Sequence, residues 1–200
     1  MSENPSPTTQ SAAPSFTPTN TGSLTAIMPP LASGEKAVPV MLYTNQALWW
    51  GSVILKEAIR VHMWLRTSAA PDIIHLYNAR MLFQGSIEKR KPMAMKDAHI
   101  FTGDILAYHL LPPEKEPLDY DPGEPNRHLD AIAAFSGAFR FDGNVLLSNL
   151  FNIGKYIETT HDRFMSLYDV EVTYPFSTYQ APLKVPLALV KISTAAFASK

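Results

Sequence analysis

Apolar residues recur with a period of two in short runs that begin near Val38. Further runs follow, in order, at residues 47–55, 59–66, 73–83 and 105–111. Because successive side chains of a strand point to opposite faces, this alternation predicts β-strands. The polar triplet Thr-Asn-Gln separates the first run from the second. The last run ends at two prolines, Pro112 and Pro113. The pattern predicts a mainly β protein.

The same order of elements starts again beyond residue 130. Trp49 and Gly51 are matched by Phe141 and Gly143, ninety-two positions later. The segment "IIHLYNARM", which begins at Ile73, is matched ninety-one positions later by "FMSLYDVEV". Strand, polar break, aromatic strand, glycine and a Leu-Tyr strand therefore occur twice in one order, which predicts a tandem duplication. The alternative is a single sandwich of roughly eight to ten strands that resemble one another.

The two Leu-Tyr segments predict strands that end at the rim of a small barrel. Each starts apolar on both faces, and one face then turns polar, as at Asn78 and Arg80 in the first segment. A strand that enters a nearly closed sheet and leaves at its rim shows this change. We predict two tandem small β-barrel or half-barrel units, at residues 37–111 and 131–200. Residues 147–158 fit either a strand or a short helix.

Two proline-rich segments lie outside these units. Residues 1–36 contain six prolines among many Ser and Thr residues and offer little apolar surface. Alone, such a segment cannot offset its ordering entropy, so we predict an extended or disordered arm that orders against a neighbour. Residues 112–130 are rich in proline and acid, which predicts a linker. Asp119 and Asp121 lack the spacing of a calcium loop, and we expect solvent around them.

Charge and composition narrow the class of protein. The 17 basic residues balance 18 acidic ones, which argues against nucleic-acid binding through a general excess of positive charge. The absence of cysteine excludes disulfides, thiolate metal sites and cysteine catalysis. The N-terminal sequence lacks the features of a secretory signal, and no apolar run approaches the ~20 residues that a bilayer requires. We expect a cytoplasmic protein with no membrane span.

Sequence motifs for catalysis or metal binding are not found. The chain has no glycine-rich phosphate loop, no HExxH and no GxSxG. Its 6 histidines are scattered, and His62 and His75 are the best candidates for a pair on neighbouring strands. Two strand histidines fall short of the ligand number that zinc normally takes. We therefore expect no catalytic residue, no cofactor and no metal site, and a protein that is not an enzyme.

Tryptophans and arginines indicate a surface for contacts. Trp49 and Trp50 are neighbours in a predicted strand, so one indole should fill the core and the other point outward. Trp64 lies between Arg60 and Arg66 in sequence, and Trp and Arg are enriched at interfaces. We predict that these five residues contribute to an interface.

The order of short strands, with a bent Gly-Val strand followed by a hydrophobic hairpin, resembles the Sm-like small β-barrel. The resemblance spans residues 38–111 and 130–194 and rests on pattern, without the RNA-binding signature of that family. Sm-like proteins form rings by strand addition at barrel edges. The resemblance therefore implies assembly through strand edges and transfers no functional residue.

We interpret the chain as a non-enzymatic structural or assembly subunit. It would associate with itself or with a protein partner through strand edges, Trp-bearing surfaces and the N-terminal arm. The alternative is an Sm-like nucleic-acid-binding or regulatory module that contacts phosphates through Lys89, Arg90 and Lys91. A third interpretation is a barrel that binds a small molecule between Tyr77 and Tyr168.

Overall fold

The chain was analysed as a computed structural model, which describes residues 28–67, 70–84, 92–121, 123–174 and 182–200. Within these residues, an open 11-stranded sheet contains only antiparallel pairs. The strands are β1 (Glu35–Thr44), β2 (Ala47–Lys56), β3 (Ile73–Phe83), β4 (Met93–Ala94), β5 (Asp97–Phe101), β6 (Ile105–Leu110), β7 (Arg127–Ser136), β8 (Phe139–Ser148), β9 (Phe164–Thr173), β10 (Leu183–Lys191) and β11 (Ala195–Ser199). The helical elements are α1 (Val61–Arg66), α2 (Ile153–Thr159) and the 3-10 turns η1 (Thr102–Asp104) and η2 (Ile192–Thr194). The prediction of a mainly β protein is confirmed.

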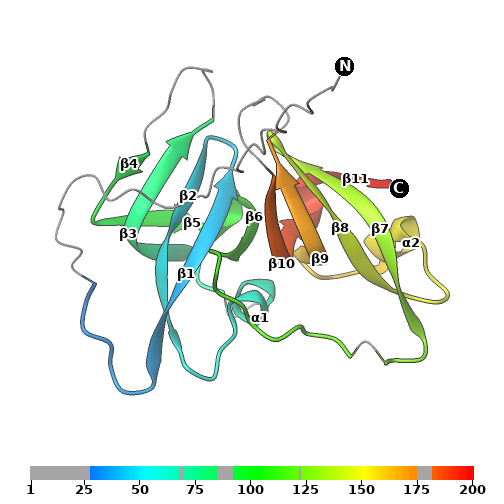
Figure 1. The fold of residues 1–200 in the computed structure, drawn as a ribbon, viewed down its shortest axis with the longest axis horizontal. Coiled ribbons are helices and arrows are strands. Elements are labelled where there is room, and N and C mark those ends of the chain that lie inside the picture. Colours follow the sequence, from blue (N-terminus) through cyan, green and yellow to red (C-terminus); the bar gives the residue numbers. More distant parts are fainter. Residues whose placement is uncertain (1–27, 68–69, 85–91, 122, 175–181) are drawn as a thin grey trace, which may run out of the picture.

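The sheet is divided into two lobes (Figure 1). The first lobe contains β1 to β6 with α1, and the second contains β7 to β11 with α2. Each lobe follows one order: two strands, a helix, further strands, a 3-10 turn and a last strand. The strand order is β11-β7-β8-β9-β10-β6-β1-β2-β3-β4, and β5 also pairs with β3. The lobes are therefore joined where β10 meets β6.

The first two strands of each lobe pair in the same register. Val38 pairs with Val53 between β1 and β2, and Asp130 pairs with Val145 between β7 and β8. Both partners of the second pair lie ninety-two positions after those of the first. The pairing of β2 with β3 is irregular just after Trp50, and that of β8 with β9 is irregular at the corresponding place.

A glycine occupies each irregularity because the facing strand approaches closely. A Cβ on Gly51 would lie 2.6 Å from the carbonyl oxygen of Tyr77, and Gly143 meets the second lobe's equivalent carbonyl at 3.0 Å. On the facing strands, Asn78 and Asp169 adopt positive φ angles of 51° and 50°. Asn and Asp tolerate this left-handed conformation better than most other residues do. Both lobes thus bend one strand by the same local device.

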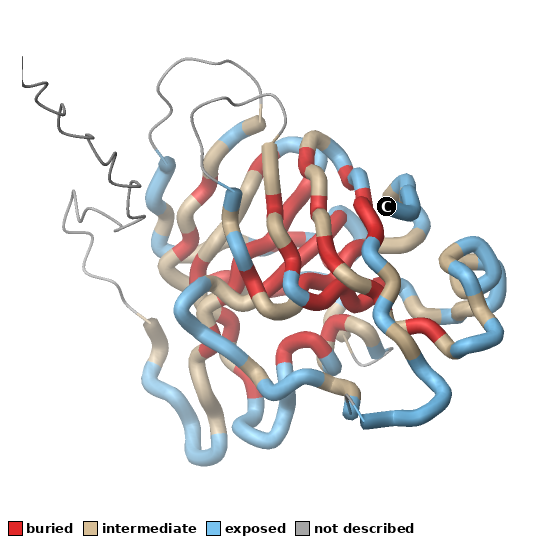
Figure 2. Tube along the Cα trace, turned by 45° about the vertical axis from the view of Figure 1, so that its right-hand side comes forward, coloured by how far each residue is buried: buried red, intermediate tan, exposed pale blue. Residues whose placement is uncertain are grey.

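Two clusters of buried apolar side chains form the core, and each takes residues from both lobes. Figure 2 shows where buried residues lie along the chain trace. Val40 and Leu42 on one face of β1 belong to the cluster of the first lobe. Met41 and Tyr43 on the other face belong to the cluster of the second lobe. β1 is therefore buried on both sides, as expected of a strand in the interior of a sheet.

The prediction of a strand at residues 59–66 is wrong. Val61 and Leu65, one helical turn apart in α1, are each 1% exposed, whereas Met63 between them is 46% exposed. Apolar residues over so short a segment fit both the period of two of a strand and the 3.6-residue period of a helix. The helix forms because it packs Val61 and Leu65 together on the cluster of the first lobe. Neither helix of the described residues is long and apolar enough to cross a bilayer.

The boundaries of other predicted segments shift by a few residues. Residues 147–158, for which the sequence allowed a strand or a helix, contain part of each: β8 ends at Ser148 and α2 begins at Ile153. β1 begins at Glu35, inside the predicted arm, and residues 1–27 of that arm lie outside the described residues. β7 begins at Arg127, inside the predicted linker.

Candidate assembly interface

The junction of the two lobes is a stretch of continuous sheet. Tyr108 of β6 lies opposite Leu189 of β10, and Ala107 lies opposite Val190. All four residues are at most 1% exposed. β6 also pairs with β1 along its other edge, so both of its edges are occupied. The lobes are therefore bound by backbone pairing and by burial of the paired side chains.

Aromatic rings pack across the junction on both faces of the sheet. The Tyr43 ring of β1 meets Phe139 and Phe141 of β8 edge to face, with centroids 4.7 and 5.2 Å apart. On the other side, Tyr108 meets Phe164 of β9 at 5.4 Å, also edge to face. Such edge-to-face pairs add to the stabilisation that burial alone gives.

Arg66 at the end of α1 ties the first lobe to the second. Its Nη1 donates to Asp119 Oδ2 and its Nη2 to Asp162 Oδ2, both at 2.8 Å. Nη1 also lies 3.2 Å from the Ser166 hydroxyl, and Tyr168 donates to the other Asp119 oxygen at 2.5 Å. Burial and the neighbouring Asp119 carboxylate raise the pKa of Tyr168, so its hydroxyl keeps the proton that it donates. The linker is thus held between the lobes at Asp119.

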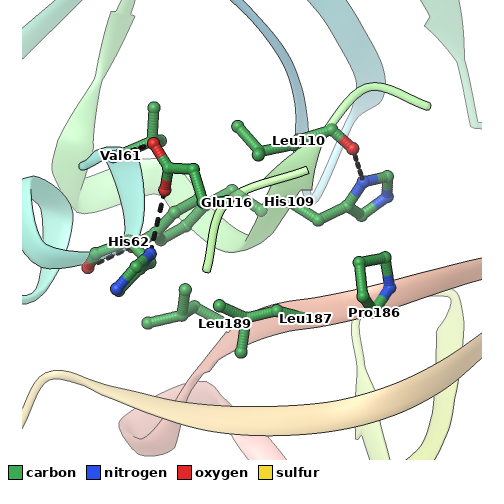
Figure 3. Close-up of a pocket in the computed structure, with 9 residues that line it drawn as sticks. Val61, His62, His109, Leu110, Glu116, Pro186, Leu187 and Leu189 are labelled. Carbon is green, nitrogen blue, oxygen red and sulfur yellow. Dashed lines mark hydrogen bonds and ion pairs between the residues drawn. The ribbon is translucent and has the colours of Figure 1, made fainter. Parts of the chain in front are cut away.

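A second carboxylate of the linker holds the start of α1 (Figure 3). Glu116 accepts from His62 Nδ1 at 2.9 Å and from the Val61 backbone N–H at 3.0 Å. Partial burial alone would raise the pKa of Glu116, but the hydrogen bonds from His62 and Val61 and the electrostatic interaction with His62 together lower it. His62, Glu116 and Leu189 line a cavity of about 20 Å³. That volume holds about one water molecule and is too small for a substrate.

His109 is buried in the junction as a neutral ring. Its Nδ1 donates to the carbonyl oxygen of Leu110 at 2.7 Å, so its Nε2 accepts from the Tyr43 hydroxyl at 2.8 Å. Burial lowers the pKa of His109 to about 4. At neutral pH this histidine therefore contributes two hydrogen bonds and no charge.

Two edges of the sheet remain unpaired in the described part of the chain. β4 and β5 each pair with β3 alone and together form one edge, and β11 pairs with β7 alone and forms the other. By element order, β5 occupies the place in the first lobe that β10 occupies in the second, and β11 corresponds to β6. The two free edges are thus the counterparts of the two edges that meet at the junction, and they lie in different lobes (Figure 1).

Apolar side chains beside the free edges are exposed where their counterparts at the junction are buried. Phe135, the counterpart of Tyr43, is 43% exposed, and Tyr43 is 2% exposed. Ile73, the counterpart of Phe164, is 43% exposed, and Phe164 is 1% exposed. Phe101 on β5 is 59% exposed. These free edges therefore carry the apolar surface expected of a contact site.

The five residues predicted at an interface do not gather in one place. Trp49 and Trp50 are both half-buried; Trp49 packs on the cluster of the first lobe and Trp50 on that of the second. Trp64 of α1 is half-buried on the first cluster, and Arg60 before α1 is exposed. Of the five, Arg66 forms the polar contacts of the lobe junction described above.

The other predicted sites are a basic patch and a pair of tyrosines. Lys89, Arg90 and Lys91 lie outside the described residues. Tyr77 stacks on His75, and Tyr168 hydrogen-bonds Asp119. Neither tyrosine lines the cavity beside His62 or a larger cavity of about 180 Å³ beside Tyr120.

Sequence reasoning missed the roles of several polar residues. Glu116 and Asp119 were expected in a solvated linker, but their side chains are only 12% and 10% exposed. His75 lies beside Asp97 and His99, and the only sequence signal of this group is the i, i+2 spacing of Asp97 and His99, which puts both on one face of a strand.

No protein-family model matches the chain, and the searches of curated proteins and of solved structures found no similar protein.

Proposed function

We propose that this protein is a non-enzymatic structural subunit that assembles with copies of itself, β11 of one chain adding to β5 of the next. The observation that carries the proposal is the pairing of β6 with β10, which joins the two lobes within one chain. The counterparts of those two strands are unpaired in the described residues and flanked by exposed apolar side chains. An edge strand of this kind is a template for strand addition.

The internal junction supports one register for the proposed contact between chains. Tyr108 pairs with Leu42 as Phe197 pairs with Ala134, so Tyr108 opposite Leu189 corresponds to Phe197 of one chain opposite His99 of the next. Ala107 opposite Val190 corresponds in the same way to Ala196 opposite Ile100. A register shift between Tyr43 and Thr44, which β7 and β11 lack, is included in these equivalences.

Side-chain packing at the new contact follows from the same equivalence. Tyr43 packs on Phe139 and Phe141, so Phe135 of one chain would pack on Trp49 of the next, the counterpart of Phe141. Ala47, the counterpart of Phe139, is 0% exposed and offers no surface for this contact. Trp49 is half-buried and would contribute its remaining surface.

The architecture that supports this function is a tandem duplication of one small β unit of the half-barrel type. The shared register, the glycine at each bend and the positive φ at Asn78 and Asp169 support the duplication. The resemblance to Sm-like barrels, which assemble through strand edges, agrees with this proposal. The contribution of the N-terminal arm and of other protein partners to the assembly stays a prediction.

Two single substitutions, one at each edge, test the proposal. Phe135→Glu places a carboxylate beside Arg140, whose guanidinium lies 5.7 Å from the Phe135 ring, so the folded chain tolerates it. Ile73→Glu places a carboxylate beside β5, at a position that is 43% exposed in the folded chain. In light scattering over a concentration series, the unmodified chain should grow in mass, and each variant alone should stay monomeric. A charge buried in an apolar contact is strongly unfavourable.

A mixture of the two variants distinguishes this head-to-tail contact from a symmetric one. Each variant keeps one intact edge, so the mixture should form a heterodimer that grows no further. Leu150→Glu, at a residue that is 90% exposed and lies on no strand edge, is the control and should assemble as the unmodified chain does. A monomeric unmodified chain, or a mixture that stays monomeric, would refute the proposal.

A further inference from the structure

Two histidines and an aspartate lie together on the outer face of β3 and β5. His75 of β3 is directly opposite His99 of β5. Asp97 precedes His99 by two residues, so the two side chains lie on one face of the strand. One nitrogen of each histidine and one oxygen of the carboxylate lie within 4.8 Å of one another.

The arrangement of His75 leaves one ring nitrogen without a partner. Its ring lies between those of Tyr77 and His99, with centroids 4.0 and 4.2 Å away. His75 Nε2 is closed to solvent and makes no hydrogen bond, although Asp97 Oδ2 lies 3.5 Å away. Leaving a buried polar atom unsatisfied costs free energy, so an additional partner at this nitrogen would be stabilising.

We propose that His75, His99 and Asp97 form a binding site for a divalent transition-metal ion of the Zn²⁺ type. Imidazole nitrogens together with a carboxylate oxygen suit zinc, cobalt, nickel and copper better than calcium or magnesium. The carboxylate balances one of the two charges of the ion. Three protein ligands leave at least one position for water or for a further ligand.

The scaffold of the site is rigid enough to keep the three ligands together. His75 and His99 are fixed across one antiparallel pair, and Leu76 and Ile100 on the opposite face are buried at 0% and 6% exposure. The side chains of His75 and Asp97 are 36% and 40% exposed, so the rim of the site faces solvent. His75 Nε2 itself is closed to solvent, so the stacked His99 ring or the Asp97 carboxylate must turn for an ion to bind it. All three ligands belong to one chain, so a single chain holds the complete site. His99 also lies on the β5 edge that the proposed assembly would cover, so metal binding is compared in the unmodified chain and in the monomeric Phe135→Glu variant.

The test is titration of the full-length, tag-free chain with Zn²⁺ by calorimetry and with Co²⁺ by visible absorption. We expect one ion per chain, an absorption band of coordinated Co²⁺, and a higher melting temperature with metal. His99→Ala should weaken binding by more than tenfold. Asp97→Asn keeps the shape of the side chain, so it should weaken binding without affecting folding.

His128→Ala is the matched control. His128 Nε2 lies 3.2 Å from Asp130 on the surface, and no other His or acidic residue of the described chain completes a three-ligand group there. This variant should bind Zn²⁺ as the unmodified chain does, and so should Phe135→Glu, which tests the assembly alone. An unmodified chain that binds no Zn²⁺, or a folded Asp97→Asn or His99→Ala variant with undiminished affinity, would refute the site.

Discussion

Protonation of the buried residue His109 makes the stability of the folded chain depend on pH. His109 is 2% exposed, and burial lowers its pKa to about 4, whereas a histidine in an unfolded chain titrates near ~6.5. The unfolded chain therefore binds a proton first as the pH falls. Because the folded pKa is depressed, the stabilisation is present above about pH 6.5 and is lost progressively towards pH 4. The shift corresponds to about 3 kcal/mol at most.

Replacement of this histidine by a neutral residue should remove that part of the acid sensitivity. We expect His109→Gln to be less stable than the unmodified chain near neutral pH, because it disturbs the hydrogen bond with Tyr43. Its free energy of unfolding should then fall less steeply between about pH 6.5 and pH 4. Urea unfolding at several pH values measures both effects. His161→Gln, at an exposed histidine, is the control, and equal slopes in all three chains would contradict the prediction.

Secondary-structure elements in both lobes depend on close approach at a glycine. At Gly51 the obstacle to a Cβ is the backbone oxygen of Tyr77 at 2.6 Å, which cannot move without disturbing β3. At Gly143 the Tyr168 oxygen and a Val170 methyl are both 3.0 Å away, and the methyl can give way. We therefore expect Gly51→Ala to cost about 2–3 kcal/mol and Gly143→Ala less.

Chemical denaturation of the two alanine variants tests this order. Asn78→Gly is the control on the facing strand, because its φ of 51° suits glycine and no close contact is introduced. It should change the free energy of unfolding by much less than Gly51→Ala does. A Gly51→Ala variant as stable as the unmodified chain would show that β2 and β3 can separate at this point.

Local pattern predicted most elements, and long-range contacts decided the rest. The strand at residues 73–83 was predicted at its observed bounds, because its apolar and polar positions alternate over its length. The helix at residues 61–66 was missed because six residues satisfy either period, and its first N–H is held by Glu116, far along the chain. Asp119 looked like a solvated linker residue for the same reason: its partners Arg66 and Tyr168 are distant in sequence. Neither contact has a local signal.

The described part of the molecule combines an internal junction, formed by β6 and β10, with two unlike edges that are unpaired. Because the edges of β5 and β11 are different surfaces, a contact between them joins chains head to tail and forms a ring or a filament according to the rotation between chains. The same junction also couples the two lobes. Met41, Tyr43 and Ala107 of the first lobe belong to the cluster of the second, and Phe164 and Leu189 of the second belong to the cluster of the first. We therefore expect the lobes to unfold together.

The 3 tryptophans provide a direct test, because all of them lie in the first lobe. Leu147 of β8 is 0% exposed in the cluster of the second lobe, so Leu147→Ala should cost about 2–5 kcal/mol through the cavity that it leaves. If the lobes unfold as one unit, urea unfolding followed by tryptophan fluorescence should shift to lower urea by as much as unfolding followed by circular dichroism. Independent lobes would instead leave the fluorescence transition in place while circular dichroism shows an earlier step. Trp50 packs on the cluster of the second lobe, so it is replaced by Phe in both chains that are compared. A common shift can then reach Trp49 and Trp64 only through the shared sheet and core.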